Sequence, residues 1–463
     1  MISIDTLSDD VLLDIFDFCV DKFRFTKPEI EGWQSLVHVC RRWRSVVFGS
    51  PRRLDLHLVF TDKTHVREML DVWPPLPVVI RSSLTKDVDN IVAALEHRDR
   101  VGRIHLFDVN NSPWEKVSAK MQGPFPELTF LALASTWNDE TLPDFPDSFM
   151  SRSVPVLQGL CLHRIPFPGL PNLLLSATNL ITVHLMDIPL SGYIPPEAMV
   201  TALSTLTSLE SFILQFQSPL SSPARESRRP PPTTRYVLPT LTFFTFQGAC
   251  EYLDDLVTPI DTPRLKDFST TLSNNTVFDT SQSVRFISRT PRLKSLETAR
   301  IVFEGIIASV NFLSRSSGNG SLQANIIYSE VDWQVSFLKQ ICTSYLPPFS
   351  TTKDLYVYRH PHWQVNIENI RWLEVLHPFS AVENLHLCKE FGPRIVTALQ
   401  ELAGSRTTEV LPILQNIFLE EVQPSGPGQE DIRKFVSARE LSGHPITVSH
   451  WERDAEWDLN LRG

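Results

Sequence analysis

The sequence predicts an α/β protein with two parts. A short helical module at the N-terminus precedes a long, irregular solenoid, with parallel strands on the concave face and helices or loops on the convex face. Three observations predict this fold class. Apolar residues recur at helical spacing in the first fifty positions, and one apolar template recurs many times after about residue 100. Proline (35 residues) is twice as common as glycine (17 residues), which favours many short elements.

Composition and charge exclude several classes of protein. A chain of 463 residues with 42% hydrophobic and 21% charged residues has an ordinary globular balance, which excludes wholesale disorder. The formal net charge of -10 opposes general binding to phosphate backbones, so we expect no nucleic-acid partner. No apolar run approaches the ~18 residues that span a bilayer, and no basic start marks a secretory signal. We therefore expect no membrane partner and an intracellular, cytoplasmic or nuclear location.

Residues 1–50 form the predicted helical module. Thr6 followed by Asp9 is typical of a helix start. Residues 21–30 show no helical period and are expected to form a loop, and Gly49-Ser50-Pro51 ends the module. Helix-spaced apolar residues occur at Leu7, Val11, Leu12, Ile15, Phe16 and Cys19, and again at Trp33, Leu36, Val37 and Cys40. Helices this short cannot bury such stripes among themselves, so they must pack on the rest of the chain or on a partner.

The two halves of this module resemble the F-box, most of all the F-box-like proteins of mushroom-forming fungi. The matching segments are residues 7–16 (LSDDVLLDIF) and 36–44 (LVHVCRRWR), followed by a strand-like stretch at 53–58. The resemblance covers roughly a tenth of the chain. It implies docking to the Skp1-type adaptor of a cullin-RING ubiquitin ligase. The residues that match the motif, and are expected to bind the adaptor, are Leu7, Val11, Leu12, Ile15, Phe16, Leu36, Val39, Cys40 and Trp43.

The module departs from the family pattern at its start and its end. Ser8 replaces the usual proline and Asp10 the usual glutamate, and the closing tryptophan is absent from residues 51–54. Loss of the proline is expected to loosen the start of the first helix. A second interpretation is that the apolar residues are the core of a helical cap. Such a cap would bury Ile15 and Phe16 against residues 53–60 and the first repeat.

Residues 101–424 repeat the template apolar-x-x-apolar-x-apolar. Clear copies begin at Val101, Leu128, Leu157, Leu180, Leu209, Leu241, Val382 and Leu414, and weaker ones lie near residues 265, 293, 322 and 355. Successive copies start roughly 23–33 residues apart, and several follow a proline. The last two apolar residues of each copy point inward, so stacked copies build a parallel sheet over one core.

This array resembles the leucine-rich repeat family. The asparagine or cysteine usual three residues after the last leucine is absent; Thr136, Ile165 and Ile188 stand there. The predicted domains are residues 1–50, a connecting or N-terminal capping region at 51–100, the solenoid at 101–424, and a C-terminal cap at 425–463. Residues 218–236 form a proline-rich insertion that we expect to be mobile, or, as the alternative, a proline-helix ligand.

No cluster of residues calls for catalysis, a cofactor or a metal. The sequence lacks phosphate-binding and catalytic motifs, and His360 and His362 have no third ligand at metal spacing. The acid pair Asp254-Asp255 is interpreted as a solvated helix cap. The cysteines, interpreted as reduced and mostly buried thiols, are Cys19, Cys40, Cys161, Cys250, Cys342 and Cys388.

The interest lies in the outward residues of the predicted strands. They mix aromatic, hydroxyl and imidazole groups, which suits recognition of a protein. The predicted substrate-binding residues are Phe130, Cys161, His184, Ile213, Thr245, Glu297, Tyr356, Tyr358, His386 and Phe418. The alternative is a sheet half covered by its own loops.

Together these features predict a non-catalytic substrate-recognition subunit of a Skp1–cullin–F-box ligase with an unknown protein substrate. The alternative is a stand-alone leucine-rich-repeat interaction scaffold whose N-terminal helices only cap the solenoid. An enzyme would need a concave pocket with convergent titratable side chains.

Overall fold

The computed structural model divides into two compact units, Met1–Ile194 and Pro195–Gly463. The described residues are 7–23, 32–51, 54, 56–61, 65–85, 88–109, 111–135, 145, 149–152, 154–217, 235–272, 281–294, 296–314, 320–328, 330–345, 351–359, 367–402, 406–420 and 427–452. The histidines at 360 and 362 and residues 218–234 of the predicted insertion lie outside them.

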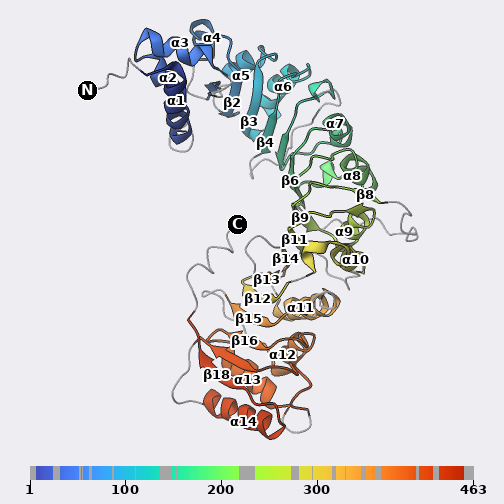
Figure 1. The fold of residues 1–463 in the computed structure, drawn as a ribbon. Coiled ribbons are helices and arrows are strands. Elements are labelled where there is room, and N and C mark those ends of the chain that lie inside the picture. Colours follow the sequence, from blue (N-terminus) through green and yellow to red (C-terminus); the bar gives the residue numbers. More distant parts are fainter. Residues whose placement is uncertain are drawn as a thin grey trace. The chain divides into compact units, whose positions relative to one another are not determined.

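The first unit starts with three helices, which we call the head: α1 (Asp9–Phe23), α2 (Gly32–Val37) and α3 (Arg41–Gly49). A parallel sheet follows, in which each strand pairs with the next: β1 (Leu58–Phe60), β2 (Val78–Ser83), β3 (Val101–Val109), β4 (Phe130–Ser135), β5 (Gly159–His163) and β6 (Thr182–Ile188). The connecting helices lie along one side of this sheet (Figure 1): α4 (Val66–Val72), α5 (Val88–Leu95), α6 (Asn111–Lys120) and α7 (Leu170–Ser176), with 3₁₀ turns at Phe149–Arg152 and Leu190–Gly192.

The array begins earlier than the sequence indicated. Residues 51–100 were expected to be a connecting or capping region, yet β1 pairs in parallel with β2, and β2 pairs in parallel with β3 with one register shift after Val78. Val78 and Ile80 are fully buried, as inward residues of a repeat should be. Of the strand-like stretch at residues 53–58, Leu58 is the first residue of β1, and residues 53 and 55 lie outside the described residues.

The apolar template describes the core correctly. In β4 and β5 the inward side chains Leu131, Leu133, Leu160 and Leu162 are all buried, and the residues between them are half-buried. The first apolar residue of each copy lies in the turn before its strand; Leu128, for example, has no exposed surface. Period-two alternation thus separates a covered face from a face free of helices, which we call the open face.

The backbone turns sharply after several strands. φ is 54° at Asp108, 58° at Arg164 and 50° at Asp187, a region that L-residues other than asparagine and aspartate rarely adopt. The Ser83 hydroxyl donates to the Asp108 carboxylate at 2.6 Å, and His163 Nε2 lies 3.2 Å from Asp187 Oδ2. These contacts between neighbouring strands occur in a repeat that lacks the usual asparagine ladder.

The sheet of the second unit is mostly parallel but contains one reversed strand. Its strands, in spatial order, are β7 (Ser211–Phe216), β9 (Phe243–Gly248), β11 (Asp267–Leu272), β14 (Ser321–Ile327), β13 (Ile307–Leu313), β12 (Thr298–Glu304), β15 (Asp354–Arg359), β16 (Asn384–Leu387), β17 (Asn416–Leu419) and β18 (Thr447–His450). β13 is antiparallel to both β12 and β14, which corrects the prediction of parallel strands throughout. A two-residue loop joins β12 to β13, with Gly305 at φ +59°.

Helices again lie along one side of this unit (Figure 1): α8 (Pro196–Leu203), α9 (Cys250–Val257), α10 (Ser281–Arg289), α11 (Val331–Tyr345), α12 (Asn369–Leu376), α13 (Gly392–Gln400) and α14 (Pro427–Leu441), with a 3₁₀ turn at Pro291–Leu293. The short strands β8 (Tyr236–Val237) and β10 (Ile260–Asp261) pair apart from the main sheet. α14 and β18 both lie within residues 425–463, the region predicted as a C-terminal cap.

The acid pair on α9 is not a solvated cap. Asp254 is buried, and one carboxylate oxygen accepts hydrogen bonds from the backbone N–H and the hydroxyl of Ser283, at 3.0 and 2.7 Å. The side chain therefore joins α9 to the first turn of α10, where a carboxylate satisfies helix N–H groups.

Candidate functional site

Part of the predicted adaptor motif forms the core of the head. Leu12 and Phe16 have no exposed surface and Leu36 is 8% exposed. The Phe16 ring packs against Trp43, with ring centroids 4.8 Å apart. In this arrangement Leu12, Phe16 and Leu36 do not offer their side chains to a partner, which corrects their expected role as contact residues.

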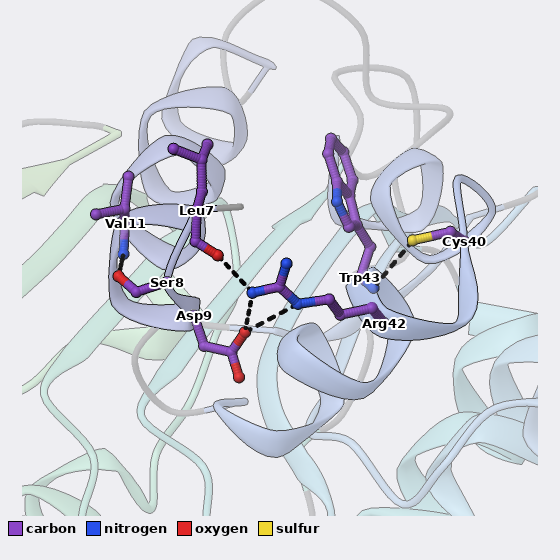
Figure 2. Close-up of polar contacts among 7 residues, drawn as sticks. All are labelled: Leu7, Ser8, Asp9, Val11, Cys40, Arg42 and Trp43. Carbon is purple, nitrogen blue, oxygen red and sulfur yellow. Dashed lines mark hydrogen bonds and ion pairs between the residues drawn. The ribbon is translucent and has the colours of Figure 1, made fainter. Parts of the chain in front are cut away.

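The start of α1 is held by side chains from two helices (Figure 2). The Ser8 hydroxyl accepts the Val11 N–H at 3.4 Å, and its carbonyl accepts the Leu12 N–H, so Ser8 is the N-cap. The Arg42 guanidinium, from α3, donates to the Leu7 carbonyl at 2.5 Å and to Asp9 Oδ1 at 2.7 Å. Serine in place of the usual proline therefore leaves α1 capped and not loosened. Thr6, the cap expected from sequence, lies outside the described residues.

A second stripe on α1 remains exposed. Val11, Ile15 and Phe18 follow one another at steps of four and three, and they are 43%, 39% and 72% exposed. Residues at this spacing share one face of a helix. Val39, between α2 and α3, is 58% exposed, and the neighbouring Cys40 is also exposed, its sulfur accepting the Trp43 N–H. We call Val11, Ile15, Phe18 and Val39 the apolar stripe.

The head also packs on the first repeat. Trp33, on α2, is fully buried, and its ring lies 5.2 Å from that of Trp73, at the end of α4. Its Nε1–H donates to the His57 carbonyl at 3.2 Å, and Phe48, on α3, lies 6.3 Å from Trp73. The contact with the array is thus made by α2 and α3, while Ile15 stays partly exposed on α1.

The open face of the first unit carries three of the predicted substrate-binding residues. Cys161 and His184 are directly opposite each other on β5 and β6. Phe130, on β4, stacks on His105 of β3 with centroids 4.8 Å apart and a 25° interplanar angle. Its ring also covers Gly159, where a Cβ would lie 2.4 Å from Phe130 Cδ2.

The open face of the second unit carries a stack of rings. Tyr356, His386 and Phe418 lie opposite one another on β15, β16 and β17, with centroid separations of 4.0 and 4.4 Å. The ring of Trp451, just after β18, stands edge-on to Tyr356 and His386. The other predicted residues, Ile213 and Thr245, face each other on β7 and β9.

A polar ladder runs beside the ring stack. The Asn384 amide donates to Asp354 at 2.7 Å, and the Asn416 amide donates to Asn384 at 2.8 Å. The Thr447 hydroxyl donates to the Asn416 oxygen at 2.5 Å. Asp354, Asn384 and Asn416 each lie two residues before a ring of the stack, on the same face of the same strand. Their hydrogen bonds therefore hold the polar side chains beside the stack in fixed positions.

Two predicted substrate-binding residues are not placed as expected. Glu297 lies before the first residue of β12 and is not an outward strand residue. The residue of β12 that pairs with Tyr356 is Arg300. Tyr358 shares a face with Tyr356 but is buried. The predicted substrate-binding residues do not include His105, although it is the middle outward position of the template copy that begins at Val101. Arg300 and Trp451 lie outside the clear copies, so the template did not point to them.

Two observations concern the chemistry of the residues that the structure describes. These residues include no group of three or more histidine, cysteine or acidic residues able to hold a metal ion. Burial raises the pKa of the Cys388 thiol to about 12 and raises that of Cys342 as well, so neither supplies a thiolate near neutral pH. Among the described helices, each is too short or too polar to cross a lipid bilayer.

No family model matches this sequence, and no curated protein matches it either. Among solved structures, the leucine-rich repeat-containing protein LegL7 from Legionella pneumophila is similar at 11% identity, with a TM-score of 0.26. The match covers 82% of this chain and 97% of that chain. The repeat architecture described above rests on the strand register and burial of this chain itself.

Proposed function

We propose that this chain is a non-catalytic interaction protein whose head docks a Skp1-type adaptor of a cullin-RING ubiquitin ligase. The open faces of its sheets would hold a protein substrate. The chain would act by bringing that substrate close to the ligase.

The observation that carries the proposal is the part of the apolar stripe that lies on α1, Val11, Ile15 and Phe18. The head already has its own core in Leu12 and Phe16, and it is attached to the array through Trp33. Val11, Ile15 and Phe18 are 43%, 39% and 72% exposed, and their spacing places them on one face of α1. Exposed apolar surface of this kind marks protein-interaction sites. Two of these three residues, Val11 and Ile15, belong to the segment that resembles the F-box.

The test is capture of the purified full-length chain by immobilised Skp1. A Val11→Ser/Ile15→Ser double substitution should weaken capture at least tenfold, because truncating central interface residues typically costs about 2 kcal/mol or more. The matched control is Leu190→Ser/Leu441→Ser, which changes two exposed leucines far from the head in sequence, 71% and 90% exposed. The control variant should be captured like the wild type. Equal capture of the Val11/Ile15 variant would contradict adaptor docking.

A second candidate function is a stand-alone interaction scaffold whose head only caps the array. The packing of Trp33 and Phe48 on Trp73 favours it, since these contacts cover the end of the first repeat. For this function the wild-type chain should show no affinity for Skp1, and Trp33→Ala should destabilise the first unit by ~3–5 kcal/mol as a large-to-small core change does. Capture of the wild-type chain by Skp1 decides between the two functions.

A further inference from the structure

The open face of the first unit contains a hollow that the proposed adaptor docking does not use. It has a volume of about 360 Å³ and lies across β3 to β6, with Arg103, His105, Phe130, Gly159 and Thr182 among its lining residues. All of these belong to one compact unit. The volume is at the lower end of known ligand sites, large enough for one or two side chains and too small for a folded domain.

The lining of this hollow includes a stacked pair of rings, His105 and Phe130. His105 and Phe130 are stacked, and the Phe130 ring extends over Gly159 because that residue has no Cβ. Any side chain at position 159 would meet the ring, so glycine is what allows the ring to lie along the sheet. An aromatic side chain from a partner can pack edge-to-face or offset-stacked against this pair.

The charges around the hollow are positive. Arg103 and Arg81 are exposed, and neither makes an ion pair with any residue in the part of the chain that the structure describes. Arg81 lies opposite His105 in the strand register, and Arg103 lies two residues before His105 on the same strand. Burial lowers the pKa of His105, and the charges of Arg81 and Arg103 lower that pKa further, so both cations act at the hollow.

We propose that this hollow binds an acidic segment of a partner protein, in which a carboxylate pairs with Arg103 or Arg81 and an adjacent aromatic side chain packs against the His105–Phe130 pair. Arginine pairs with a carboxylate through two parallel hydrogen bonds, which gives both strength and geometry. A nucleotide would also offer a flat ring and negative charge. The open, shallow form of the hollow favours a peptide, because small-ligand sites enclose most of the ligand surface.

This inference rests on the proposed use of the open face for protein recognition and not on adaptor docking. The net charge of the whole chain is -10, so non-specific attraction of an acidic peptide is unfavourable. Binding of such a peptide would therefore report a local site. Salt should weaken it, because the arginines are exposed.

The experiment uses the full-length chain and fluorescein-labelled copolymers of glutamate and tyrosine, with fluorescence anisotropy as the readout. The wild-type chain should bind this probe and should not bind a copolymer of glutamine and tyrosine. Arg81→Gln/Arg103→Gln should weaken binding by about tenfold or more, the usual effect of losing a hydrogen bond to a charged group. Gly159→Ala should weaken it as well, without any change of charge, by displacing the Phe130 ring.

The matched control is Arg285→Gln/Arg433→Gln, which removes two exposed arginines from α10 and α14. It should bind like the wild type, and circular dichroism should show that all variants are folded. The proposal is overturned if the wild type does not bind the acidic probe, if the control loses as much affinity as the Arg81/Arg103 variant, or if AMP binds the hollow and the peptide does not. Skp1 capture, measured on the same proteins, reports the proposed docking separately.

Discussion

Arg42 shows how one side chain can define the start of a helix. Its guanidinium group binds both the Leu7 carbonyl and the Asp9 carboxylate. The side chains of Arg42 and Asp9 are 37% and 64% exposed, so the ion pair itself contributes only ~0.2–1 kcal/mol. The larger effect is geometric, because the contact orients α1, and with it the apolar stripe, relative to α3.

His105 is the residue at which a pH dependence is expected. Burial is the main cause of its lowered pKa in the folded chain, followed by Arg81 and Arg103. The unfolded chain therefore binds more protons than the folded one between the lowered pKa and the ordinary value of ~6.5. The contribution of neutral His105 to stability is complete above that ordinary value. It is lost as the pH falls toward the lowered one.

The measurement is the guanidinium midpoint of the full-length chain at neutral pH and at a pH near 5.5. His105→Phe keeps a ring stacked on Phe130 and removes the titration. Its midpoint should fall less on acidification than that of the wild type. If both midpoints fall by the same amount, His105 is not a source of the pH dependence.

At the scale of the element, α1 has two apolar stripes side by side. One, through Leu12 and Phe16, is buried in the head; the other, through Val11, Ile15 and Phe18, is exposed. Helical periodicity predicts that these residues lie on neighbouring faces, but it does not tell which face the chain itself covers. Which face is covered depends on where α2 and α3 pack, and the sequence of α1 alone does not specify their position.

The β12–β13 hairpin depends on one glycine. Gly305 has φ +59°, and a Cβ there would meet nothing within 4 Å, so a substitution acts through the backbone alone. We expect Gly305→Ala to destabilise the hairpin by about 1 kcal/mol and Gly305→Asn by less, because asparagine tolerates the left-handed region. The measurement is tryptophan fluorescence followed in urea, to which buried Trp372, with its ring 5.9 Å from Phe303 on β12, contributes. Equal losses for alanine and asparagine would contradict this account.

At the scale of the whole molecule, the sequence predicts strand faces better than strand directions. The buried pairs such as Leu131/Leu133 follow directly from the template. The reversed strand β13 does not, since parallel and antiparallel strands share the same period of two. The copy that ends in Val78 and Ile80 does not fit the template, because Pro75 stands where the template has its first apolar residue.

Of the two candidate surfaces on the open faces, the sequence predicts one and not the other. The ring stack of Tyr356, His386 and Phe418 follows from taking the middle residue of each template copy. The hollow in the first unit does not, because it depends on Phe130 lying over Gly159. The sequence shows a glycine on a strand, and only the fold shows which neighbouring ring uses the space.

A chain of stacked repeats should respond locally to damage, because each repeat contacts mainly its neighbours. Asp254→Ala tests this in the second unit. It leaves the Ser283 N–H and hydroxyl without their buried acceptor, which should cost about 1–3 kcal/mol. Hydrogen exchange should then accelerate by about tenfold to a hundredfold in α9 and α10. It should stay unchanged in β2 to β4 of the first unit.

Glu440→Ala, at an exposed position of α14, is the matched control and should change neither region. Faster exchange across both units in the Asp254 variant would mean that the chain unfolds as one cooperative body, and the surfaces of the two units could not then be varied independently.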